Sequence, residues 1–137
     1  MEANSCLTLK NYIVKAIHFS INEEFKPPEN APILIDPEYE RRIRKIDDNS
    51  AFVNLIFTIK NGKNDLPFAI EVDIEGLFQL DNWEHPEINS IMTTNTIAIL
   101  FPYLRSIVSM VTANANIPPY TIPVMNITAM FDDEKKE

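Results

Sequence analysis

Two alternating segments joined by a turn constrain the fold of this chain more than any other feature. Every second residue is apolar between residues 53 and 59, and the same alternation returns between residues 68 and 74. A side-chain period of two is typical of a β-strand with one buried face. The connection at 61–65 reads Asn-Gly-Lys-Asn-Asp, a composition that favours a turn. The two segments are therefore expected to form an antiparallel hairpin.

Two further strands and one helical region are expected around this hairpin. Residues 12–21 alternate like a strand, and residues 38–46 form another candidate strand with a largely charged surface. Between residues 87 and 113 the apolar period becomes helical, and Pro102 should kink or break that helix. A last helical turn is expected within residues 122–131. Strands followed by helices indicate an α+β fold, with a four-stranded antiparallel sheet and helices packed on one face.

The length of 137 residues fits one domain, which we place at residues 1–131, followed by a charged C-terminal end at 132–137. A proline-rich connection occupies residues 26–37 and should be extended and poorly paired. Its centre, Ile33-Leu34-Ile35, is unusually apolar for a solvated loop.

Composition excludes several classes of function. The formal net charge of -8 argues against binding to duplex nucleic acid or to an anionic membrane. The two glycines, Gly62 and Gly76, fit neither a P-loop nor a dinucleotide-binding fingerprint. The most apolar stretch, residues 97–101, is shorter than a membrane span, and no signal peptide is recognisable, so a cytoplasmic location is expected.

The chain also lacks the residue spacings of catalytic and metal sites. His18, His85 and the single cysteine, Cys6, form no metal-ligand pattern, and no nucleophile motif accompanies them. We therefore expect neither an enzyme nor a metal or cofactor site. The pattern alone leaves a soluble α+β domain that binds something.

Several short segments occur in an order and spacing that resembles the SecB protein-export chaperones. They are Leu-Phe-Pro-Tyr-Leu-Arg at 100–105 with Ser-Ile-Val-Ser-Met-Val at 106–111, Ile-Pro at 117–118, Pro-Val-Met-Asn at 123–126, Ala-Met-Phe at 129–131, Asn-Ala-Pro at 30–32, Phe-Ala-Ile-Glu-Val at 68–72 and Gly-Leu-Phe at 76–78. The similarity extends over residues 7–131. It is the combination of segments, more than any one of them, that is specific.

This resemblance implies an ATP-independent chaperone that holds unfolded polypeptides in apolar grooves and assembles as a dimer of dimers. One groove wall would come from the apolar loop and a nearby aromatic residue, and the floor from a helix. The implied client-binding residues are Ile33, Leu34, Ile35 and Tyr39 in the wall and Leu100, Tyr103, Leu104 and Val108 in the floor, with part of this helix stripe belonging to the ordinary core. The apolar face formed by Phe68, Ile70, Val72 and Ile74 is expected at an oligomer interface or in the core.

Contact with the SecA motor is a further implication. Acidic residues on the outer sheet serve this purpose in export members, and here Glu71, Asp73 and Glu75 are the candidates. Two first-strand positions where the family has carboxylates carry Ala16 and Ser20, which weakens the implied docking. Residues 132–137 contain no cysteine or histidine, so the zinc-binding tail of export members is absent and no zinc is expected.

Three roles are consistent with these observations. One is a general holdase in protein export or transport. Another resembles the tail-less SecB-like chaperones that protect the antitoxin of a toxin–antitoxin system. The third is a structural or adaptor protein that keeps the fold and binds one cognate partner.

Overall fold

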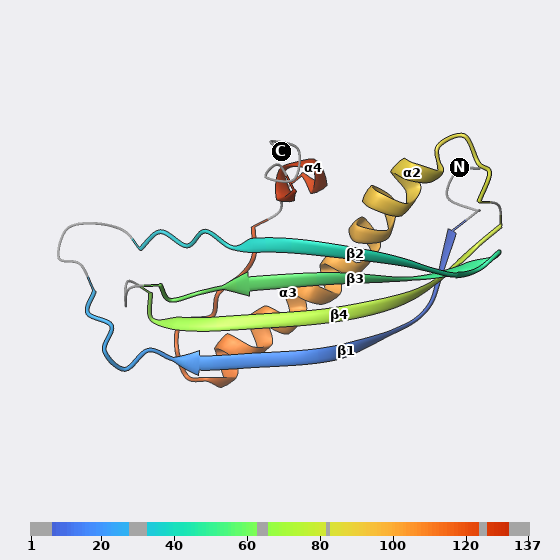
Figure 1. Cartoon of the computed structure of the whole chain (residues 1–137). Coiled ribbons are helices and arrows are strands. Elements are labelled where there is room, and N and C mark those ends of the chain that lie inside the picture. The colour runs from blue at the N-terminus through green and yellow to red at the C-terminus, as the bar shows by residue number, and fades with distance from the viewer. Residues whose placement is uncertain (1–6, 28–32, 63–65, 82, 124–125, 132–137) are drawn as a thin grey trace.

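The computed structural model describes residues 7–27, 33–62, 66–81, 83–123 and 126–131. It contains one antiparallel sheet of four strands, which are β1 (Leu7–Ile21), β2 (Glu38–Asp47), β3 (Ser50–Ile59) and β4 (Phe68–Leu80). Their order across the sheet is β1-β4-β3-β2, so β1 and β2 form its two edges. A long helix lies across one face (Figure 1), and the expected α+β fold class is confirmed.

The central hairpin has the register that the alternation predicts. Val53 lies opposite Gly76 and Phe57 opposite Val72, so the apolar residues of both strands share one face. That face is buried under the helix. The four side chains that were expected at an oligomer interface, Phe68, Ile70, Val72 and Ile74, are at most 4% exposed within this single chain. They are core residues here, because the helix already covers them.

The helical region is divided into α2 (Ile88–Ser90), the π-helical turn η1 (Ile91–Asn95) and α3 (Thr96–Asn114). α3 runs through Pro102 without the break that was one of the two expected effects of the proline. Pro102 is exposed, so the helix carbonyl that lacks its usual N–H donor can be solvated. The irregular part of the helical region is the π-helical turn η1, which precedes Pro102. There the Thr93 and Thr96 hydroxyls donate to the carbonyls of Asn89 and Met92.

α3 supplies the apolar layer that covers the sheet. Its buried apolar residues are Ile97, Leu100, Phe101, Leu104 and Val108. The helix approaches β4 closely at Gly76, where an added Cβ would lie 3.0 Å from Leu100 Cδ2. The glycine therefore permits the helix to pack directly on the strand.

The helical run of residues 88–114 is long and apolar enough to cross a membrane by length and composition alone. The expectation that the most apolar stretch is too short for a membrane span considered residues 97–101 alone and missed the longer helical run. The core helix of a soluble protein meets the same criterion, and the apolar side of α3 packs on the sheet. The run is weak evidence for a membrane span.

After α3 the chain returns alongside the helix to the edge strand β2. Arg105 Nε donates to the Ile122 carbonyl at 2.7 Å, and the Tyr120 backbone N–H donates to Thr112 Oγ1 at 2.8 Å. These bonds hold the returning segment against α3. It leads to the short helix α4 (Ile127–Met130), which confirms the expected last helical turn and lies beside β2 (Figure 1).

Candidate functional site

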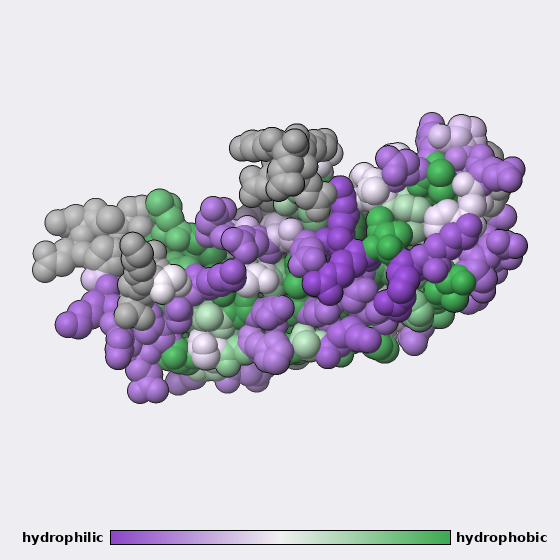
Figure 2. All heavy atoms as spheres, viewed as in Figure 1, coloured by the Kyte–Doolittle hydropathy of each residue, from purple (hydrophilic) through white to green (hydrophobic). Residues whose placement is uncertain are grey.

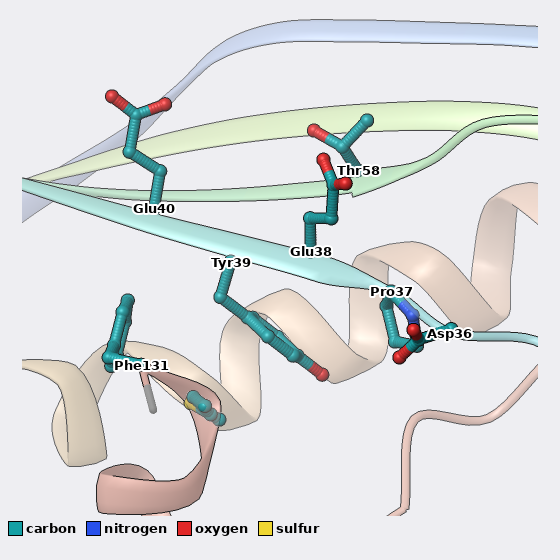
Figure 3. Close-up of a pocket in the computed structure, with 8 residues that line it drawn as sticks. Asp36, Pro37, Glu38, Tyr39, Glu40, Thr58 and Phe131 are labelled. Atoms are coloured by element: carbon teal, nitrogen blue, oxygen red, sulfur yellow. The ribbon is translucent and has the colours of Figure 1, made fainter. Parts of the chain in front are cut away.

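A pocket of about 360 Å³ lies where β2 begins and α4 ends (Figure 3). It is lined by Asp36, Pro37, Glu38, Tyr39, Glu40, Thr58, Met130 and Phe131. The lining comes from two parts of the chain far apart in sequence, the start of an edge strand and the last described residues.

The pocket follows both faces of β2. Tyr39 projects to the helix side of β2, where Phe131 also lies, whereas Glu38 and Glu40 project to the opposite side with Thr58 (Figure 3). Successive side chains of a strand point to opposite faces. The aromatic side chain therefore lies on one face of β2, and the carboxylates that precede and follow it in the sequence lie on the other. Because β2 pairs with β3 alone, the pocket lies around a sheet edge whose other side has no strand neighbour among the described residues.

Aromatic rings form the apolar side of the pocket. The ring centroid of Tyr39 lies 5.4 Å from that of Phe57 and 6.4 Å from that of Phe131. Burial raises the pKa of Tyr39 to about 12, and the neighbouring Tyr120 hydroxyl adds to the shift. The Tyr39 phenol is therefore neutral at physiological pH, and this side of the pocket carries no charge of its own.

The rim of the pocket is acidic. Asp36, Glu38 and Glu40 all line it. Lys60 Nζ lies 3.9 Å from Glu38 Oε1, and both side chains are more than 70% exposed, so this pair is weak. Arg42 Nε donates to Glu40 Oε2 at 2.8 Å. The rim combines three carboxylates with two solvent-exposed cations, which favours a cationic ligand.

The apolar loop leads directly into this pocket. Leu34 is 82% exposed and Ile33 is 41% exposed, whereas Ile35 packs against the core. The pocket-lining residue Asp36 follows at once. Exposed side chains of this size beside a pocket enlarge the apolar surface that a ligand can cover. The Asn-Ala-Pro segment at 30–32 lies outside the described residues.

The helix residues expected in the groove floor lie elsewhere. Leu100, Leu104 and Val108 are fully buried between α3 and the sheet. Tyr103 is 38% exposed, but its ring stacks on Tyr12 of β1 with centroids 4.3 Å apart, at the opposite edge of the sheet from β2. The structure thus brings Tyr39 and the apolar loop together and keeps the four helix residues apart from them.

Tyr39 is the one pocket-lining residue that was expected as a site residue, and those that were not expected include Met130 and Phe131. Both are nearly buried and close the helix side of the pocket. The Ala-Met-Phe segment at 129–131 was one of the motifs that carried the resemblance. That match was the available signal that Met130 and Phe131 could belong to the site.

The acidic residues expected to contact SecA differ strongly in their environment. Glu71 is exposed. Asp73 Oδ1 accepts a hydrogen bond from Asn54 Nδ2 at 2.9 Å. Glu75 is nearly buried and lies 3.8 Å from Lys15 Nζ. Figure 2 shows the outer face of the sheet as mainly hydrophilic, with apolar residues between the polar ones. Its acidic residues do not form a uniform exposed row.

Among the described residues, no group of three or more His, Cys, Asp or Glu side chains is placed to hold a metal ion.

The whole described chain matches one protein family. The family model for SecB, preprotein translocase subunit SecB, matches residues 4–137. This chain belongs to the SecB family. SecB-family chaperones are non-enzymatic, so the expectation that the protein is not an enzyme agrees with its family.

Relatives within the SecB family include archaeal and bacterial proteins. An uncharacterised protein of Methanocaldococcus jannaschii is 35% identical over 136 residues, which cover 96% of this chain and 87% of that protein. The protein-export protein SecB of Saccharophagus degradans is 26% identical over 99 residues, covering 71% of this chain and 59% of that one.

A solved structure has the same SecB-like fold. The SecB-like chaperone of Mycobacterium tuberculosis, in complex with a ChAD peptide from the HigA1 antitoxin, superposes with a TM-score of 0.69. The match covers 90% of this chain and 94% of that one at 15% identity. At this identity the similarity concerns the fold.

Proposed function

We propose that this protein is an ATP-independent holdase that binds unfolded polypeptide segments in the pocket around the start of β2. The observation that carries the proposal is the combination of an aromatic floor at Tyr39 and Phe131, an acidic rim and the exposed Ile33 and Leu34 beside them. Membership of the SecB family supports it.

The physical basis is binding to the unfolded state. A folded client hides its apolar side chains, whereas an unfolded one exposes them in extended segments. A surface that binds only exposed segments lowers the concentration of free unfolded chain by mass action, and needs no nucleotide to do so. The aromatic side chains offer large contact areas, and the carboxylate rim favours clients that carry lysine or arginine near the apolar residue.

The clients fall into two possible groups. Relatives are named protein-export proteins, which supports a role in export, and the mycobacterial chaperone of the same fold is seen with an antitoxin peptide, which supports a dedicated client. The outer face of the sheet favours a dedicated client over a role in export, because the residues implied in contact with SecA are incomplete there. Glu75 is engaged with Lys15, and Ala16 and Ser20 stand where export members have carboxylates.

We infer that copies of the chain assemble through β1, in the cytoplasm. This strand is a sheet edge, and several of its large apolar side chains are 41–48% exposed: Ile13, Val14, Ile17 and Ile21. Apolar residues along an edge strand are a liability unless another surface covers them. A homotetramer built as a dimer of dimers is the proposed assembly.

The decisive experiment is aggregation suppression with two unrelated, chemically unfolded proteins, with particle mass measured by light scattering in the same samples. A general holdase suppresses the aggregation of both clients. The variant Ile33→Asp/Leu34→Asp should suppress less while keeping the particle mass of the wild type, because both side chains are exposed in the single chain.

Other outcomes separate the alternatives. Suppression of neither client by a well-folded oligomer would favour a dedicated chaperone or an adaptor. Binding of an antitoxin encoded beside the gene, with protection from proteolysis, would identify the dedicated chaperone. Stable binding of one folded partner, with no effect on any unfolded chain, would overturn the holdase proposal in favour of the adaptor.

A further inference from the structure

Arg41 connects the two elements that form the helix side of the pocket, β2 and the end of α4, to the π-helical turn η1. It follows Tyr39 by two positions in β2 and therefore lies on the same face of the sheet. Its guanidinium carbon lies 4.1 Å from the centroid of the Phe131 ring. Its Nη1 donates to the Thr93 carbonyl of η1 at 2.8 Å. One side chain on β2 thus contacts the end of α4 and the π-helical turn.

The contact with Phe131 matters because α4 has little to hold it in place. A helix of four residues is unstable without tertiary contacts. Apart from the Asn126 cap on the Thr128 N–H, α4 is anchored by the buried side chains of Met130 and Phe131 and by the partly buried Ile127. Arg41 is half-buried, and a cation over an aromatic face is a stronger contact where water is partly excluded.

The position of Phe131 in turn sets the shape of the pocket. Its ring meets Tyr39 nearly edge-on, at an interplanar angle of 64°. A shift of Phe131 away from β2 would widen the space beside Tyr39, and a shift toward it would close that space. Side chains in close-packed surroundings transmit such changes directly.

We propose that Arg41 is a positioning residue that fixes Phe131 against Tyr39 and thereby determines which client side chains the pocket accepts. The inference rests on the proposed holdase function and adds a specificity determinant to it. Arg41 itself contacts no client in this scheme and acts through the Phe131 ring. The guanidinium is suited to this role because one flat group stacks on the ring and donates to the Thr93 carbonyl at the same time.

Lys45 provides a matched control. It lies on the same strand and face as Arg41 but outside the pocket, and its Nζ lies 4.9 Å from the centroid of the Trp83 ring. Arg41→Ala and Lys45→Ala therefore make the same change in net charge, and each removes a cation from an aromatic ring. Arg41→Lys keeps the charge and loses the flat group.

The test measures the binding of two unstructured, lysine-flanked apolar peptides that differ in one central side chain, leucine in one and tryptophan in the other. The wild type should distinguish the two peptides. Arg41→Ala should bind the preferred peptide about tenfold more weakly and lose most of the distinction. Arg41→Lys should recover part of both, and Lys45→Ala should match the wild type.

Amide hydrogen exchange on the same samples locates the effect. Arg41→Ala should speed exchange at the α4 amides of Ala129 and Met130, which bond to the Asn126 carbonyl, and leave the β3 and β4 amides protected. Equal binding and peptide preference in Arg41→Ala and the wild type would overturn the inference and leave the holdase proposal intact. Equal losses in Arg41→Ala and Lys45→Ala would also overturn it, by assigning the effect to charge. A wild type that binds neither peptide nor any unfolded protein would overturn the function and the inference together.

Discussion

Arg44 Nη2 lies 3.7 Å from Glu75 Oε2, although the two residues belong to strands that do not pair with each other. Glu75 on β4 also meets Lys15 of β1, so one carboxylate connects both edge strands through the centre of the sheet. Only 7% of the Glu75 side chain is exposed. Removing the cations from a buried carboxylate is costly to the folded state, so the stability of the sheet should depend on this arrangement.

The first prediction concerns this pair of cations. The double variant Lys15→Met/Arg44→Met should lower the free energy of unfolding by about 2–3 kcal/mol, because it leaves the Glu75 charge buried and unpaired. Urea unfolding at neutral pH measures the change.

Glu71→Gln is the control, because Glu71 lies on the same strand and face but is exposed. It should change stability by less than about 0.5 kcal/mol. Equal effects of the double variant and the control would mean that Glu75 is hydrated and does not depend on the two cations.

The second prediction concerns the approach of α3 to the sheet. Gly76→Ala places a methyl group 2.8 Å from Phe78 Cε2 and 3.0 Å from Leu100 Cδ2. It should destabilise the protein by about 2 kcal/mol through overpacking, measured by urea unfolding. Gly62→Ala is a useful comparison, because Gly62 lies in a turn with φ 57°. This substitution should lower the free energy of unfolding by about 1 kcal/mol through backbone strain alone. A Gly76→Ala variant as stable as the wild type would show that the helix can move away without cost.

The third prediction is a loss of stability in strong alkali. The pKa of Tyr39 is raised to about 12 in the folded protein, against about 10 in an unfolded chain. Burial favours the neutral phenol, so the contribution of Tyr39 to stability is complete below pH 10. It is lost as the pH rises through 12, because the unfolded chain releases the proton first.

Tyr39→Phe should therefore flatten the decline in unfolding free energy between about pH 10 and pH 12. Burial also raises the pKa of Tyr120, so some slope should remain until Tyr120→Phe is added. Urea unfolding across this range measures both effects. Parallel curves for the wild type and Tyr39→Phe would contradict the assignment.

The fourth prediction concerns the acidic rim of the pocket. The triple variant Asp36→Asn/Glu38→Gln/Glu40→Gln should bind a lysine-flanked apolar peptide about tenfold more weakly at low salt, because it removes the charge complementarity. Raising the salt concentration should bring the wild type toward the variant, as a titration by fluorescence anisotropy would show.

A second triple variant changes the net charge equally but at exposed positions outside the pocket, Glu71→Gln/Asp81→Asn/Glu87→Gln. It should bind like the wild type. If both triple variants weaken binding to the same extent, the whole-protein charge of -8 attracts the peptide and the rim has no special part.

The sheet was predictable because its signal is local. The alternation at residues 53–59 and 68–74 can be satisfied by one buried face, and the observed register of β3 and β4 satisfies it. β1 begins at Leu7, earlier than the alternation indicated. The register shifts near Asn11 and Ala16 interrupt its period of two, so the alternation revealed only part of the strand.

Only part of the pocket was predictable. Tyr39 and the loop beside it were recognisable because apolar residues are unusual in a proline-rich connection that should be exposed to solvent. The helix stripe at Leu100, Leu104 and Val108 was ambiguous, because helical spacing shows that a face is covered and does not show what covers it. The sheet covers it here. Phe131 escaped notice as a site residue because no short-range pattern relates it to Tyr39.

One consequence of the pocket's construction concerns the order of protein synthesis. Residues 36–40 leave the ribosome early, and residues 130–131 leave it last among those that form the pocket. Between them the chain must complete the hairpin, lay α3 over it and return along α3 to β2. A copy still being translated therefore has no assembled pocket and cannot capture its own unfolded strands there. Capture of a client begins only when the chaperone's own folding is essentially finished.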